Sequence, residues 1–513
     1  MSLSNVEFGK IRAFFWPIHR HELKKVVPML LMLFFICFNY SILKNLKDTI
    51  VVTAKSSGAE VIPFIKVWVL LPMAVLFTVI FTKLSNRFSQ ERVFYITIST
   101  FILFFGAFTF ILYPYRDVLH PHQFADSLEI ILPAGFKGLI AMFRNWSFTL
   151  FYVMCELWST MVLTVLFWGF ANEITKIGEA RRFYSIFSLV ASLSSIIAGA
   201  GANRLTINYN WQQALEIYVI LIMIAGGITM VIFRWMNKNV LNDPCFDELH
   251  KTKRELKTKK RLSMRESFSY LSNSKYLICI AALVVSYNLV INLVEIVWKD
   301  QLRQLYSSPL EYNYYMNNTT ATVGIISAVL SLSMPRLINR FGWTFTALIT
   351  PILMLITSIG FFAFMLFRQD LAGFVLTLTG MTPLMIAIFF GASQVCLSKA
   401  CKYSVFDATK EMTFIPLGHE SKLKGKAAID GIGSRLGKSG GSLIHQGLLM
   451  VFATISTSAP YVAMILLFVI VGWIVAAQSL GRQFAQITGD EPEEERVPVT
   501  VSKNVSNLQP AKG

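Results

Sequence analysis

Charged side chains interrupt several long apolar stretches of this sequence. Four of them are hardest to place at a helix end, and they are Lys66, Glu156, Glu295 and Lys438. An ionised residue at the centre of a membrane span costs at least ~2.5–3.5 kcal/mol on insertion scales, so it needs a partner or a polar cavity. Lysines spread over several helices are suited to bind phosphate oxygens, because charge-assisted hydrogen bonds are strong at short range. The pattern indicates passage of a highly charged anionic solute.

Polar residues at helical spacing extend three of these runs. They form the stripes Arg144, Phe148, Tyr152, Glu156 and Thr160; Asn288, Asn292, Glu295 and Lys299; and Asp430, Ser434 and Lys438. The first run also carries lysines in NYSILKNLKDTIVVT. From these we take as further candidates for solute binding Lys47, Arg144, Tyr152, Asn292, Asp430 and Ser434.

A structural role is the alternative for these charges. They can form ion pairs that hold helices together, or extend from helix ends to water. Both roles stay open for four residues near expected helix ends: Lys44, Arg144, Arg182 and Lys299. Two aromatic residues, Phe148 and Tyr152, are likewise suited either to packing or to stacking on a planar ring.

The glycine-rich segment GIGSRLGKSGG superficially resembles a phosphate-binding loop. The required G-x-x-x-x-G-K-S/T spacing fails, because position 432 is Ile432 and no strand is expected before it. No CxxC pair, metal-ligand cluster or nucleophile motif occurs in the sequence either. We therefore expect no cofactor, no bound metal and no enzymatic activity.

The composition defines the class of protein. Of 513 residues, 54% are hydrophobic and only 15% charged, with a mean hydropathy of +0.54. A soluble protein carries about a quarter charged residues. The net charge of +17 suggests a nucleic-acid partner, but the excess lies in loops between apolar spans, as in cytoplasmic loops of membrane proteins. We expect a polytopic α-helical membrane protein that contacts lipid and binds no nucleic acid.

Apolar runs of about 20 residues predict twelve transmembrane helices in two six-helix halves. The expected spans are 26–53, 61–83, 92–113, 138–171, 182–204, 214–236, 275–302, 314–338, 343–366, 372–400, 426–452 and 460–481. The fourth and tenth runs are long, so the number of spans is uncertain by one.

Basic residues predict the orientation. Most lie on the side that holds both termini, and five lie on the other: Lys55, Arg116, Lys137, Arg303 and Arg368. Both termini should therefore be cytoplasmic. The expected organisation is a cytoplasmic tail (1–25), a first bundle (26–236), a basic linker (237–274), a second bundle (275–483) and a polar tail expected to be disordered (484–513).

The two halves share a short element. KLSNRF follows the second span and RLINRF the eighth, 253 residues apart. With six spans on each side of a basic linker, this favours two parallel repeats, the plan of the major facilitator superfamily, in which solute binds between the halves.

Several segments together resemble the non-mitochondrial ATP/ADP translocase (nucleotide transporter) family of plastids and obligate intracellular bacteria. They are NYSILKNLKDTIVVTAKSSGAEVIPFIKVW, CELWSTMVLTVLFWGFANEIT, NLVEIVWK, VFDATKEMTFIPL and KGKAAIDGIGSRLGKSGG. The resemblance covers about residues 25 to 483, and the short N-terminus is more like the chlamydial members. In that family two lysines and two glutamates are critical for transport, and by motif they correspond to Lys66, Glu156, Glu295 and Lys438.

The resemblance implies a carrier that exchanges host ATP for ADP and phosphate across a bacterial inner membrane. We expect it to be a monomer without an obligate protein partner. The family also contains proton-coupled nucleoside triphosphate symporters, so the transport mode stays open. Two further alternatives are another solute, which fits the excess of cations poorly, and a membrane enzyme.

Overall fold

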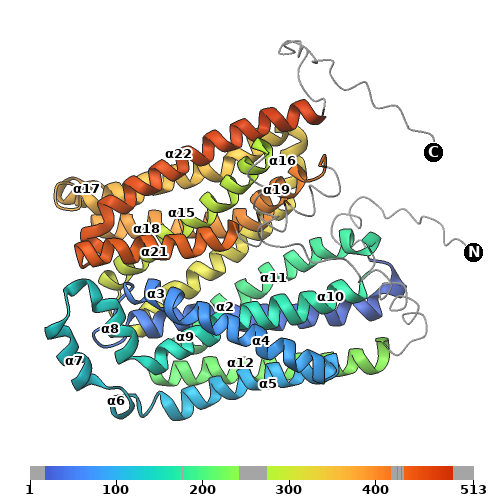
Figure 1. Cartoon of the computed structure of the whole chain (residues 1–513), viewed down its shortest axis with the longest axis horizontal. Helices are drawn as coiled ribbons and strands as arrows, with labels where there is room; N and C mark the ends of the chain where they lie inside the picture. The colour runs from blue at the N-terminus through green and yellow to red at the C-terminus, as the bar shows by residue number, and fades with distance from the viewer. Residues whose placement is uncertain are drawn as a thin grey trace, which may run out of the picture.

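Helices make up nearly all of the described structure. The computed structural model describes residues 18–175, 177–241, 274–417, 425, 429 and 433–488. Figure 1 shows two groups of helices, one from the first half of the chain and one from the second, which lie against each other along their length. The molecule is therefore built from two bundles.

The first bundle follows the short 3₁₀ turn η1 (Arg20–Glu22). It contains α2 (Leu23–Val52), α3 (Val61–Phe64), η2 (Ile65–Leu70), α4 (Leu71–Arg87), α5 (Gln90–Ala107), η3 (Phe108–Leu112), α6 (Arg116–Leu119), α7 (His122–Ile131), η4 (Ala134–Phe136), α8 (Lys137–Arg144), α9 (Trp146–Trp158), η5 (Ser159–Trp168), α10 (Gly169–Ile174), α11 (Ile177–Thr206), α12 (Trp211–Met236) and η6 (Asn237–Leu241). The segments η2, η3, η5 and η6 are π-helical and continue their neighbouring α-helices.

The second bundle is simpler in outline. It contains α15 (Lys275–Leu305), α16 (Pro309–Leu366), α17 (Ala372–Thr379), α18 (Pro383–Cys401), the π-helical η7 (Lys402–Phe406), α19 (Asp407–Thr413), α21 (Ser434–Phe452) and α22 (Ile455–Thr488). We call the end of the molecule that carries α7 and α17 the hairpin end, and the opposite end, where α2 begins and α22 ends, the terminus end (Figure 1).

Ten helices of the described part are long and apolar enough to cross a membrane. The remaining two expected spans, 314–338 and 426–452, correspond to the first part of α16 and to α21. Helix α16 runs through two expected spans and bends at Gly342, whose φ of 76° few other residues adopt readily. The structure is consistent with twelve spans in two halves.

Both long runs are broken rather than continuous. The run expected at 138–171 divides at Asn145, with φ −102° and ψ 49°, into α8 and the span that begins at Trp146. The run expected at 372–400 divides after Gly380, which has a φ of 69°, into α17 and α18. The prediction of one continuous helix over each of these two runs is therefore wrong. The interruptions occupy corresponding places, before the fourth span of each half.

The repeated L-x-N-R-F element ends a helix in each half. Helix α4 ends at Arg87, and Phe88 is extended. In the second half the element ends at Phe341, directly before the bend at Gly342. The two copies therefore mark the same turn between the second and third spans of each half.

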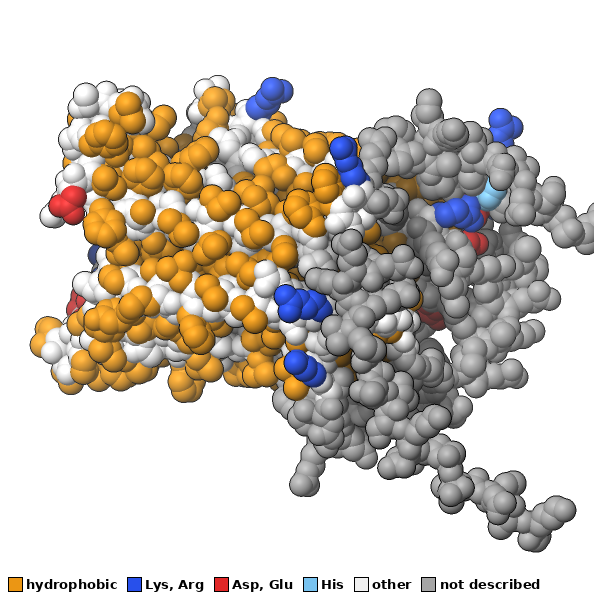
Figure 2. Space-filling view, turned by 90° about the horizontal axis from the view of Figure 1, so that it is seen from above, with side chains coloured by type: hydrophobic (Ala, Val, Ile, Leu, Met, Phe, Trp, Pro, Cys, Tyr) orange, Lys and Arg blue, Asp and Glu red, His pale blue; other side chains and the backbone are white. Residues whose placement is uncertain are grey.

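The outer surface is apolar. Figure 2 shows hydrophobic side chains across the middle of one broad face. Many large hydrophobic side chains of the molecule are strongly exposed, for example Leu103, Val231 and Phe468. A soluble monomer does not expose so much apolar surface, so this surface faces lipid.

The halves approach each other closely through α11 and α16. A methyl group on Gly324 would lie 2.7 Å from the backbone oxygen of Ser192, and one on Gly199 would collide with the backbone of Asn317. At the hairpin end, a methyl group on Gly135 of η4 would lie 2.6 Å from the Cα atom of Met450. Small residues thus let the backbones of the two halves touch.

Candidate functional site

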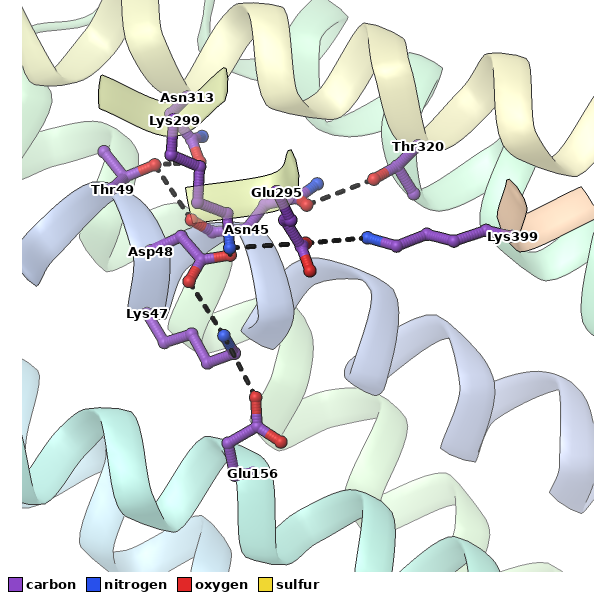
Figure 3. A network of polar contacts seen from close by, with 10 residues as sticks. All are labelled: Asn45, Lys47, Asp48, Thr49, Glu156, Glu295, Lys299, Asn313, Thr320 and Lys399. Atoms are coloured by element: carbon purple, nitrogen blue, oxygen red, sulfur yellow. Dashed lines mark hydrogen bonds and ion pairs between the residues drawn. The ribbon is translucent and has the colours of Figure 1, made fainter. Parts of the chain in front are cut away.

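A chain of alternating charges lies where the two halves meet, and Figure 3 shows it from close by. In the first half, the Nζ atom of Lys47 lies 2.8 Å from Asp48 Oδ1 and 3.1 Å from Glu156 Oε1. Lys47 and Asp48 are buried on α2, and Glu156 lies on α9 with 28% of its side chain exposed. Lys47 therefore shares its charge between two carboxylates.

The series of ion pairs continues into the second half of the molecule. The Nζ atom of Lys299 lies 2.8 Å from Asp48 Oδ2 and 3.3 Å from Glu295 Oε1, one turn earlier on α15. Lys399 of α18 donates to Glu295 Oε1 at 3.0 Å. Among the described residues, the Asp48–Lys299 pair is the ion pair that joins the halves within this network. We call the six residues Lys47, Asp48, Glu156, Glu295, Lys299 and Lys399 the paired set.

Three nearby lysines have no such partner. Lys44 of α2, Lys66 of η2 and Lys438 of α21 form no hydrogen bond or ion pair with any described residue through their side chains. Lys66 is within electrostatic range of Glu156 and Glu295, Lys44 of Glu295, and Lys438 of Glu156. We call Lys44, Lys66 and Lys438 the unpaired set. Lys66 lies in a π-helical segment, a feature frequent at functional sites.

Aromatic and amide side chains surround the charges. The Nζ atom of Lys47 lies 4.0 Å from the centre of the Tyr152 ring, a cation–π distance. Phe148 instead stacks on Tyr113 at 5.6 Å, within an aromatic core. Packing is therefore the role of Phe148, while Tyr152 lies against the network.

The amide of Asn292 joins two helices of the second half. Its Nδ2 atom donates to the backbone oxygen of Lys438 at 2.8 Å, and its Oδ1 atom is buried without a partner. A methyl group on Gly441 would lie 2.9 Å from Asn292 Cβ, which explains why glycine stands on this face of α21. Ser434 begins α21 and is half-buried, while Asp430 lies outside the described residues.

A layer of neutral polar residues lies beside the charges. Asn45 Nδ2 donates to Asn317 Oδ1 at 2.7 Å, and Asn317 Nδ2 donates to Asn203 Oδ1 at 2.9 Å. These contacts join α2, α11 and α16, and so join the halves. Additional bonds in this amide layer are made by Thr49 to Asn313 at 3.1 Å and by Thr320 to Asn45 at 3.1 Å.

A third contact between the halves joins α3 and η2 to α21. Gln446 donates through Nε2 to the backbone oxygen of Pro63 at 2.8 Å and accepts from Trp68 Nε1 at 3.3 Å. All of these contacts lie in the hairpin half of the molecule. The charged site is solvated from the other direction, because Lys438 is exposed and Lys399 keeps 31% of its side chain exposed. The halves are thus closed at the hairpin end.

Arg144 is not part of this site. It is 1% exposed at the end of α8, and it binds Asp126 at 2.6 Å and Glu129 at 3.0 Å, both on α7. The stripe with Glu156 presumed one continuous helix, and the break at Asn145 turns Arg144 away. The expected role of Arg144 in solute binding is therefore corrected to an ion pair that holds the hairpin of α7 and α8.

Three members of the paired set, Asp48, Lys299 and Lys399, were not among the expected solute-binding residues. Asp48 follows Lys47 directly, Lys299 was left open between solute binding and a structural role, and Lys399 is near the end of an apolar run. The available signal was their position within a few turns of other intramembrane charges. Of the expected residues, the structure brings together Lys47, Lys66, Tyr152, Glu156, Asn292, Glu295 and Lys438.

Two helical bundles with a polar, charged centre and an apolar outer face define a multi-pass membrane protein. A solved structure of a bacterial metal transporter matches this fold with a TM-score of 0.51 at 11% identity, covering 90% of this chain and 98% of the other. The fold class expected from the sequence, an all-α membrane protein in two helical halves, is confirmed.

The family follows from a second comparison. The family model described as TLC ATP/ADP transporter matches residues 1–484, and the chain belongs to this family of ATP/ADP transporters. It is 46% identical over 489 residues to ADP,ATP carrier protein 1 of Chlamydia pneumoniae, covering 93% of this chain and 94% of that protein. It is 41% identical over 488 residues to the chloroplastic ADP,ATP carrier protein 1 of Arabidopsis thaliana, covering 93% and 76%. The resemblance stated from the motifs is confirmed.

Proposed function

We propose that the protein imports ATP in exchange for ADP and phosphate by alternating access of its two halves around the charged centre. The observation that carries this proposal is the Asp48–Lys299 pair, which joins α2 of one half to α15 of the other at 2.8 Å. An ion pair between two rigid bundles is a contact that must break when they rock apart.

The unpaired set supplies the binding charge. Lys66 and Lys438 come from opposite halves, so phosphate oxygens placed between them would draw the halves together. Lys47 joins them when nucleotide takes the place of Glu156, and Tyr152 lies beside it. Asn292 fixes α21 through the backbone of Lys438, and Ser434 and Asp430 lie one and two turns before that lysine in the sequence.

The paired set explains obligatory exchange. In the empty carrier, three lysines and three carboxylates neutralise one another and hold the hairpin end closed. Separating them without a substituting anion leaves buried charges uncompensated, which costs about 3–5 kcal/mol when one partner of a buried pair is lost. The empty carrier therefore reorients slowly, and the loaded one quickly.

The remaining expectations complete the proposal. The protein would lie in a bacterial inner membrane as a monomer, with both termini in the cytoplasm, and would carry out no chemical reaction. The terminus end is then the cytoplasmic end, and the conformation described is open to the cytoplasm.

Reconstitution into sealed liposomes tests the exchange. Vesicles loaded with ADP are supplied with labelled external ATP, and efflux of ADP is measured with and without external ATP. We expect efflux to require ATP and to be insensitive to a proton ionophore. Efflux into nucleotide-free buffer at the same rate, or uptake that collapses with the pH gradient, would instead favour proton symport, the alternative stated above.

A further inference from the structure

Among the described residues of the empty site, lysines outnumber carboxylates by three. In the paired set, three lysines face three carboxylates at 2.8–3.3 Å, which leaves no formal charge over. The unpaired set adds three further lysines. Within the described part of the chain, the centre therefore holds a formal excess of three positive charges. Asp430, which is not described, and Lys402, which has contacts of its own, are not counted.

The ionic form of a nucleotide matters for such a site. Fully ionised ATP carries about four negative charges and ADP about three, and bound Mg²⁺ removes two of them. Unchelated ADP would neutralise the unpaired set, and unchelated ATP would exceed it by one charge. The magnesium complexes of ATP and ADP would leave one and two lysines uncompensated, respectively, in a largely buried site.

The carboxylates of the site are not free to hold the metal of a chelate. Mg²⁺ is bound in proteins by carboxylates that keep several waters in octahedral geometry. Asp48, Glu156 and Glu295 each contact a lysine Nζ atom, and Asp48 and Glu295 contact two. In the described ranges, no group of three or more His, Cys, Asp or Glu side chains is arranged to hold a metal ion. Mg²⁺ entering with the nucleotide would face the cations of the unpaired set.

We infer that the protein transports the unchelated, Mg²⁺-free nucleotides and discriminates against their magnesium complexes. This inference rests on the proposed function and specifies the ionic form of its substrate. For ADP the charge count itself favours the unchelated form. For ATP, where both forms differ from the unpaired set by one charge, selection comes from repulsion between the bound Mg²⁺ and the unpaired lysines, because like charges placed together in an interface are strongly unfavourable.

The test uses the full-length protein in ADP-loaded liposomes. Labelled ATP is supplied at several total concentrations, and free Mg²⁺ is varied from excess EDTA to several millimolar. We expect all initial rates to fall on one curve when plotted against the concentration of unchelated ATP, with uptake of the complex at least about tenfold slower. A preformed, exchange-inert chromium(III)–ATP complex should not be taken up above the background of protein-free vesicles.

A charge-deleting variant sharpens the result. Lys44→Gln reduces the unpaired set to two cations, and we expect the preference for unchelated over chelated ATP to fall several-fold. The control is Lys83→Gln, an exposed lysine at the end of α4, which should keep the wild-type preference.

Three outcomes decide the matter. Rates that follow unchelated ATP support the inference. Rates that follow the magnesium complex or total ATP overturn it and leave ATP/ADP exchange intact. The absence of ATP uptake above protein-free vesicles at every Mg²⁺ concentration overturns the proposed function and this inference with it.

Discussion

The paired and unpaired lysines occupy one site but have different roles. Lys47, Lys299 and Lys399 each contact a carboxylate, while Lys44, Lys66 and Lys438 contact none among the described residues. A paired cation stabilises the conformation in which it is paired, whereas an unpaired one stabilises whatever anion arrives. The comparison teaches that substrate affinity and the resistance of the empty carrier to reorientation can be altered separately.

The largest effect is expected from reversing an unpaired charge. Lys438→Glu or Lys66→Glu places a carboxylate where phosphate should bind, and we expect nucleotide uptake to fall by at least about 100-fold. The measurement is uptake of labelled ATP by cells expressing each variant, with the amount of protein in the membrane matched. Lys83→Glu is the control. Uptake at wild-type affinity in either cavity variant would contradict the assignment.

Removing the central carboxylate should loosen the carrier rather than block binding. Asp48→Asn deletes the ion pair between the halves, so the empty carrier should reorient faster. We expect ATP entry into nucleotide-free liposomes, relative to exchange, to rise by about 5–10-fold. The matched control is Asp126→Asn, which removes a carboxylate paired with Arg144 away from the site. A ratio equal to that of wild type would show that this pair does not limit reorientation.

The amide layer should affect closure alone. Asn317→Ala removes the partner of Asn45 Nδ2 and of Asn203 Oδ1, at a cost of about 1–3 kcal/mol to the closed hairpin end. We expect faster labelling of a reporter cysteine, Ala202→Cys, by an impermeant maleimide added from the hairpin side. Thr322→Ala, an exposed residue that bonds within its own helix, should leave labelling unchanged. Equal labelling in the two variants would rule out a gating role for the layer.

The smallest effect is expected from a buried histidine outside both sets. His120 follows α6 and shares a 2.7 Å hydrogen bond with Ser147. Burial, helped by the neighbouring His122, lowers the pKa of His120 from 6.5 to about 4. The unfolded chain takes up this proton first, so stability should decrease as the pH falls from about 6.5 to about 4.

Thermal unfolding in detergent across this pH range measures the effect. His120→Asn retains a hydrogen-bonding side chain but cannot be protonated, and it should show a weaker pH dependence than wild type. The variant separates this contribution from titration of the transport site. An unchanged pH dependence would mean that other groups account for it.

Many residues of the candidate site could be predicted from the sequence, because charged residues are conspicuous in apolar runs. Lys66, Glu156, Glu295 and Lys438 stand out by their position within apolar runs, and the structure places all four near one another where the halves meet. Their partners were not predictable, because Lys399 lies 104 residues from Glu295 and only the fold brings them together. A single sequence contains no record of such pairing.

Local irregularities account for the other differences. The stripe from Arg144 to Glu156 assumed 3.6 residues per turn throughout, and Asn145 interrupts it. Helix propensity does not reveal such a break, because asparagine is tolerated both in helices and at their ends. The amide layer was equally hidden, since Asn45 and Asn317 resemble ordinary polar interruptions of a span until their 2.7 Å contact is seen.

The chemistry of the amide layer has a consequence for how the carrier responds to ionic strength. Dissolved salt screens the attraction between lysines and a nucleotide approaching through water, over a Debye length of about 10 Å at 0.1 M. Hydrogen bonds between neutral amides, such as those of Asn45, Asn203 and Asn317, carry no net charge to screen. Added salt should therefore weaken nucleotide capture while leaving the contribution of the amide layer to closure unchanged. An organism that lives in fluids of varying salinity would lose transport rate under such conditions, but its membrane would not become leaky.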